Sequence, residues 1–191
     1  MAHLQESIEV EVPVSTAYNQ WTQFETFPEF MSGIESVEQI DETSLHFRTE
    51  IAGVKREYNA QITEQLPDRR IAWVSNDKPR NSGIITFESL GADRARINVE
   101  LEWEPEGLAE KAGSIIGVDS HQVSADLKRF KEFIESRGIE TGAWRSSVDR
   151  GEIEDPPFET AVSGIPSTVP SPERPTGTDP FIDDDEPVDP R

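Results

Sequence analysis

The sequence predicts an α+β fold in which one curved antiparallel sheet of about seven strands packs on a long C-terminal helix. From about residue 37 to residue 104, apolar side chains recur with a period of two, which is typical of strands with one buried face. Between residues 116 and 134 they recur every three or four positions, which indicates an amphipathic helix. The apolar face of the sheet needs a cover, and this helix supplies it.

A strand and two short helices are predicted before the main run of strands. Residues 4–12 alternate between apolar and polar side chains, and Pro13 ends this first strand. We expect Ser15 to cap a helix that carries apolar residues at helical spacing as far as Phe24. The run 26–29 predicts a short second helix, because it holds a second capping residue, an early proline and an acidic residue.

Six further strands and the long helix complete the predicted order, β-α-α-β6-α. Turn residues separate the strands. The first of these six strands begins near Val37, and the other five cover 45–51, 54–63, 70–75, 83–90 and 95–103. We expect Asp119 to cap the regular part of the long helix and Arg137-Gly138 to end it.

The composition changes sharply near residue 145. Nine of the 14 prolines lie in the last 36 residues, and residues 146–191 carry 12 acidic and 3 basic side chains. Such a segment buries too little apolar surface to offset the entropy of ordering its backbone. We therefore predict a domain over 1–145 and a disordered acidic tail over 146–191. Residues 179–191 could dock a basic protein partner or could simply be solvated.

Charge and composition exclude several classes of function. The net charge of −20 argues against nucleic-acid binding, and no apolar run is long enough for stable membrane insertion. The chain has no cysteine, which removes thiolate metal sites and cysteine nucleophiles. Its three histidines show no ligand spacing, so we expect no metal and no cofactor. We expect a cytoplasmic protein, because the N-terminus lacks the features of a secretory signal.

Several segments in this order resemble one known superfamily. They are Val12-Pro13-Val14-Ser15-Thr16-Ala17-Tyr18, Phe27-Pro28-Glu29-Phe30-Met31 and the closing run 126–135. Over residues 3–145 the chain resembles the START-like helix-grip (SRPBCC) superfamily, and within it the polyketide cyclase/dehydrase and lipid-transport branch, which includes coenzyme Q-binding proteins. The resemblance implies a helix-grip fold that holds a hydrophobic molecule between the curved sheet and the long helix.

Arg56 is the most informative candidate residue. It occupies an apolar position of its strand, between Val54 and Tyr58, where a buried charge needs a partner. Either Arg56 and Tyr58 meet a carbonyl, phenol or carboxylate of a ligand, or Arg56 lies near the strand end and pairs outward with a glutamate. His121 lies beside the helical stripe and could serve as an acid or base, or could lie on the surface. Arg56, Tyr58 and His121 are thus weak catalytic candidates.

The other candidates share the inward side of their strand or helix. Aromatic residues at such positions form either plain core or the wall of a ligand site. The predicted ligand-binding set is Phe47, Thr49, Arg56, Tyr58, Trp73, Ser75, Phe87, Trp103, Ile116, Val123 and Leu127.

Three functions remain open from the sequence. We expect a non-enzymatic carrier or chaperone for a lipid, an isoprenoid quinone or an aromatic polyketide-like molecule. The first alternative is a polyketide aromatase/cyclase-dehydratase, for which Arg56, Tyr58 and His121 would supply the polar groups. The second is a protein-interaction scaffold that uses the acidic tail.

Overall fold

The computed structural model describes residues 2–51, 53–75, 77–78, 80–104 and 120–154. The elements follow the predicted order, and two short strands come after the last helix. They are β1 (Ala2–Val10), α1 (Val14–Trp21), the 3-10 helix η1 (Phe24–Glu29), β2 (Ile34–Gln39), β3 (Ser44–Ile51), β4 (Val54–Leu66), β5 (Arg70–Ser75), β6 (Asn81–Gly91), β7 (Arg94–Trp103), α3 (Ser120–Arg137), β8 (Ser147–Asp149) and β9 (Glu152–Glu154).

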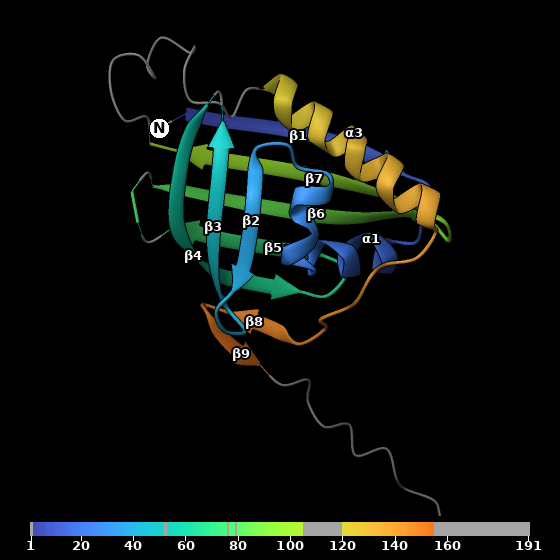
Figure 1. Ribbon diagram of the computed structural model, residues 1–191. Helices are drawn as coiled ribbons and strands as arrows, with labels where there is room; N and C mark the ends of the chain where they lie inside the picture. The colour runs from blue at the N-terminus through green and yellow to red at the C-terminus, as the bar shows by residue number, and fades with distance from the viewer. Residues whose placement is uncertain (1, 52, 76, 79, 105–119, 155–191) are drawn as a thin grey trace, which may run out of the picture. The chain divides into compact units, whose positions relative to one another are not determined.

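The strands form one antiparallel sheet with the order β1-β7-β6-β5-β4-β3-β2. Strands β2 to β7 pair with their neighbours in the chain, as expected for a meander. In Figure 1, β2 and β3 cross β5, β6 and β7 at a steep angle, so the sheet is strongly curved. Helix α3 packs along β1, while α1 contacts β6 and β7. The predicted α+β fold with a gripped C-terminal helix is confirmed.

The core joins the inner face of the sheet to α1, η1 and α3. Alternating residues of each strand face inward, and their burial removes apolar surface from water. Helix α3 contributes its stripe of Leu127, Phe130 and Ile134, which are all buried. The largest fully buried side chains include Tyr18, Phe30, Leu45, Ile62, Ile71, Ile85, Ile97, Phe130 and Ile134.

The two short helices differ in detail from the prediction. Pro13 occupies the N-cap of α1, and no side chain caps this helix, so Ser15 is not its cap. The second helix is a 3-10 helix that begins at Phe24 rather than after Thr26. The Thr26 hydroxyl instead donates to the Gln23 carbonyl (2.7 Å) and accepts from Gln20 Nε2 (3.0 Å). Ser15 cannot cap α1 because this helix already begins at Val14. Thr26 cannot begin η1 because it lies inside this helix, and its hydroxyl bonds residues that precede it.

Two short strands lie beyond residue 145, within the range predicted as a tail. Strand β8 pairs with the C-terminal half of β4, and β9 pairs with β8. Among the described residues the sheet therefore has nine strands, where about seven were predicted. Val148 of β8 is fully buried in the core. Residues 155–191, which include the possible docking segment 179–191, lie outside the described residues, as does the expected cap Asp119.

Side chains of α1 and of the β4–β5 turn hold the segment that leads from α3 to β8. Gln20 bonds Thr141 twice, through Nε2 to the threonine hydroxyl (3.0 Å) and through Oε1 from the backbone N–H (2.9 Å). Arg145 donates two hydrogen bonds to the Asp68 carboxylate (2.9 and 2.6 Å) and another to Asn19 Oδ1 (2.9 Å). The stretch that follows α3 is thus bonded to the domain before it enters the sheet.

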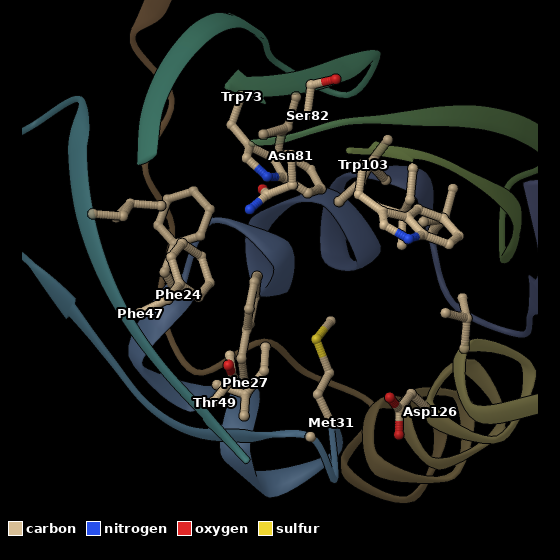
Figure 2. Close-up of a pocket in the computed structure, with 18 of the residues that line it drawn as sticks. Phe24, Phe27, Met31, Phe47, Thr49, Trp73, Asn81, Ser82, Trp103 and Asp126 are labelled. Atoms are coloured by element: carbon tan, nitrogen blue, oxygen red, sulfur yellow. The ribbon is translucent and has the colours of Figure 1, made fainter. Parts of the chain in front are cut away.

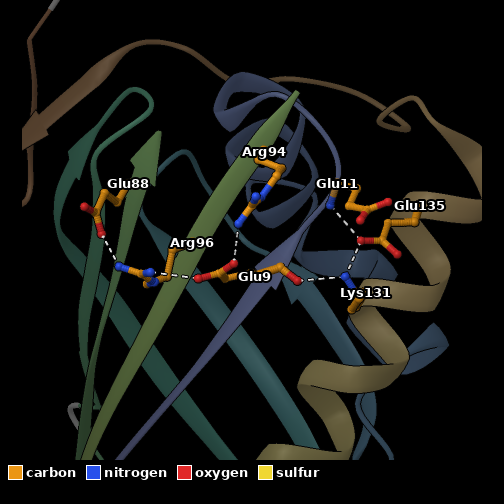
Figure 3. A network of polar contacts seen from close by, with 7 residues as sticks. All are labelled: Glu9, Glu11, Glu88, Arg94, Arg96, Lys131 and Glu135. Atoms are coloured by element: carbon orange, nitrogen blue, oxygen red, sulfur yellow. Dashed lines mark hydrogen bonds and ion pairs between the residues drawn. The ribbon is translucent and has the colours of Figure 1, made fainter. Parts of the chain in front are cut away.

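A polar network on the outer surface ties α3 to β1 and β7 (Figure 3). The Glu9 carboxylate accepts hydrogen bonds from Arg96 (2.7 Å) and Arg94 (2.8 Å), which lower the pKa of Glu9. The Glu9 backbone carbonyl accepts from Lys131 Nζ (2.9 Å), and Lys131 also bonds Glu135 (2.5 Å). The C-terminal half of α3 is therefore held to the sheet by charged groups as well as by its buried side chains.

Candidate functional site

A cavity of ≈ 230 Å³ lies between the inner face of the sheet, η1 with the loop after it, and α3. Figure 2 shows side chains from all these elements around one open space. Its apolar lining comes mainly from the sheet and the short helices: Trp21, Phe24, Phe27, Met31, Ile34, Leu45, Phe47, Tyr58, Ile62, Ile71, Trp73, Ile85, Val99, Leu101, Trp103, Val123, Leu127 and Phe130. Such a hollow with a few polar groups is typical of a small-molecule site.

Aromatic rings form much of the wall. Phe47 and Tyr58 are a cross-strand pair, and their rings stack with centroids 5.2 Å apart and planes 11° apart. On the side of the short helices, Phe24 and Phe27 meet edge to face, and Phe27 makes the same kind of contact with Trp21. These ring contacts give the wall a largely aromatic character.

The polar groups of the cavity are few and lie on β3, β4, β6, β7 and α3. Thr49 is buried, and its hydroxyl donates a hydrogen bond to the Arg56 carbonyl (3.4 Å). Burial raises the pKa of the Tyr58 phenol to about 12, so the group stays protonated at neutral pH. The Asn81 amide points into the open space in Figure 2. The cavity wall thus combines a phenol, a guanidinium and amides with the carboxylates of Glu102, Glu104 and Asp126.

The loop after η1 is bonded to α3 at the edge of the cavity. Asp126 of α3 accepts hydrogen bonds from the Ser32 backbone N–H (3.1 Å) and hydroxyl (3.3 Å). Arg129 pairs with Asp126 and donates from Nε to the Phe30 carbonyl (3.1 Å). These contacts place Met31 so that its side chain points into the cavity (Figure 2).

Most of the predicted ligand-binding residues line this cavity. Eight of them do so: Phe47, Thr49, Arg56, Tyr58, Trp73, Trp103, Val123 and Leu127. Arg56 therefore lies on the inward face of its strand, as the interpretation that it meets a ligand requires. Its side chain is half-buried. Ile116 lies outside the described residues.

Three predicted residues lie away from the cavity. Ser75 is buried, but its hydroxyl donates to the Asp77 carbonyl (2.9 Å). Phe87 lies against Tyr18, with ring centroids 5.4 Å apart. His121 is exposed on the first turn of α3 and is not among the lining residues. The alternation of side chains along a strand tells which face a residue lies on, but it does not tell which part of the strand borders the cavity. This is why Ser75 and Phe87 share the predicted face and still lie away from the cavity.

Several lining residues were not predicted. Trp21, Phe24, Phe27 and Met31, which belong to the short helices and the loop after them, line the cavity as well. Asn81 was missed because β6 was predicted to begin at Gly83. The signal was present, since Asn81 shares the parity of the inward residues of this strand.

Within the described ranges, no helix is long and apolar enough to span a membrane. The same residues hold no group of three or more His, Asp or Glu side chains suited to a metal ion.

Comparisons with known proteins point to one family. The sequence profile of the family described as "Polyketide cyclase / dehydrase and lipid transport" matches residues 10–132. An uncharacterized 17.2 kDa protein of Streptomyces lincolnensis, from the melC2-rnhH intergenic region, is 48% identical over 149 residues, which are 78% of this chain and 99% of that protein.

Solved structures share the fold at low sequence identity. A START superfamily protein from Mycobacterium smegmatis has a TM-score of 0.55 and 14% identity, over 71% of this chain and 95% of its own. The Zhui aromatase/cyclase from Streptomyces sp. R1128 has a TM-score of 0.54 and 14% identity, over 72% of this chain and 93% of its own. At such identities the likeness concerns the fold alone.

Proposed function

The chain belongs to the polyketide cyclase/dehydrase and lipid-transport family, and from this premise we propose that it binds a hydrophobic small molecule in the cavity, as a carrier or chaperone. The superfamily and the branch expected from the sequence are confirmed. The coenzyme Q-binding branch stays a prediction.

The observation that carries this proposal is the cavity itself. Its lining is largely apolar, and Arg56, Tyr58 and Asn81 add a few polar groups to the wall. A ligand with an apolar body and one acceptor group matches this pattern, because burial of the body is favourable and the acceptor can bond the neutral phenol. No acid–base pair is needed for such binding.

Native mass spectrometry of the purified full chain tests this proposal. We expect a retained apolar compound, or micromolar binding of a compound from a panel of lipids and quinones. The variant Val123→Trp fills the cavity from α3 and should abolish the bound mass. The control Lys128→Trp adds the same side chain to an exposed position of the same helix and should retain it. No retained compound and no binding across the panel would overturn the proposal.

A second candidate, an aromatase/cyclase, is favoured by the joint presence of Arg56 and Tyr58 in the cavity wall. A guanidinium and a protonated phenol can stabilise the negative charge that develops on a carbonyl oxygen during enolisation. His121, the third catalytic candidate, is exposed and does not line the cavity, so two candidate residues remain for this reaction. If Arg56→Ala and Tyr58→Phe leave the product pattern of a reconstituted polyketide synthase unchanged, the enzymatic alternative loses its residues.

A further inference from the structure

Trp73 lies across a glycine of the neighbouring strand. Trp73 and Gly83 are directly paired between β5 and β6, and Gly83 is buried. A Cβ added at residue 83 would overlap three consecutive ring atoms of Trp73, Cε2, Cζ2 and Cη2. Overlap with three successive atoms places the added carbon over the face of the ring and not beyond its edge.

The six-membered ring of the indole therefore occupies the space over Gly83 into which a side chain would project from the inner face of the sheet. The ring lies against Gly83. Trp73 is only half-buried and lines the cavity, so part of the indole is open to a guest molecule.

We propose that Gly83 and Trp73 determine ligand specificity by forming a flat aromatic platform that favours a planar ring system over a saturated body of the same size. This inference rests on the proposed function and names the class of ligand. An aromatic ligand can stack on the indole with an offset, whereas a puckered saturated ring makes fewer contacts with a flat surface.

The size of the cavity agrees with such a guest. An apolar cavity of about 150 Å³ is enough for benzene. The ≈ 230 Å³ found here exceeds that volume and accommodates a body of one or two fused rings. Of the ligand classes expected from the sequence, an aromatic polyketide-like molecule and the ring of a quinone match such a space.

Two probes with the same carbon skeleton test the platform directly: planar 2-naphthol and saturated decahydro-2-naphthol. Their dissociation constants are measured by isothermal titration calorimetry on the full chain. We expect the planar probe to bind about tenfold more tightly, which is the upper range of an aromatic stacking contact. Trp73→Leu should reduce this ratio to about one, because the leucine retains apolar contact and removes the ring face.

The role of Gly83 is tested by a pair of variants. Gly83→Ala pushes the indole off the sheet and into the cavity, so both probes should bind at least about tenfold more weakly. Adding Trp73→Leu to Gly83→Ala should recover binding of both probes with a ratio near one. This recovery requires that residue 83 act through the indole. Ile84→Val, on the opposite face of β6, is the control and should leave the ratio unchanged.

The outcomes separate this inference from the proposed function. Equal binding of both probes to the natural protein overturns the platform and leaves hydrophobic binding in place. No binding of either probe or of any compound in the lipid and quinone panel overturns both. If Gly83→Ala does not fold, the ratio measured for Trp73→Leu decides alone, and an unchanged ratio refutes the platform.

Discussion

Truncating Val148 to alanine should destabilise the whole domain. Val148 lies on β8, beyond the boundary that composition suggests, yet its side chain is 0% exposed and belongs to the core. The substitution removes two buried methyl groups at about 0.8 kcal/mol each, or about 1.6 kcal/mol in all. The space left behind adds a further cost, so we expect a loss of about 2–3 kcal/mol in the free energy of unfolding.

Urea unfolding of the full chain measures this loss as a lower midpoint with an unchanged slope. Val74→Ala is the matched control, because it makes the same chemical change at a side chain that is 39% exposed. We expect the control to cost less than about 1 kcal/mol. If Val148→Ala costs no more than Val74→Ala, the β8–β9 hairpin does not belong to the cooperative domain and our placement of its boundary fails.

Two further results are expected. Burial raises the pKa of both tyrosines, Tyr18 and Tyr58, to about 12. The phenolate absorbance of the native protein should therefore appear near pH 12, whereas that of the protein unfolded in urea should appear near pH 10. Because the unfolded chain releases these protons first, the free energy of unfolding should fall as the pH rises between those values, and native titration near pH 10 would contradict this. Asp126→Ala should accelerate hydrogen exchange of the Ser32 amide, which donates to Asp126, whereas exposed Glu132→Gln on the same helix should not; NMR of the two variants decides.

The sheet and one wall of the cavity could be predicted from sequence because both follow from local alternation. Strand β4 shows this most clearly: Arg56 and Tyr58 share one side of it, and both line the cavity. The side of a strand is set by the two-residue period of its backbone, whatever the rest of the chain does.

Features that depend on distant contacts could not be predicted. Strands β8 and β9 have three residues each and an acidic composition that resembles the tail, and the pairing of β8 with β4 joins segments far apart in the sequence. Similarly, nothing in the local sequence around Gly83 indicates that a tryptophan of another strand lies over it. The outward place of His121 depends on how α3 sits against the sheet, which helical periodicity alone leaves undetermined.

The two halves of α3 differ in what holds them, and local opening should differ accordingly. Residues 120–126 include no buried side chain, whereas Phe130 and Ile134 are fully buried and Lys131 bonds the Glu9 carbonyl. Segments with few buried apolar contacts open at a lower free energy than the global transition. We therefore expect the amide hydrogens of residues 120–125 to exchange with solvent faster than those of the C-terminal half of the helix.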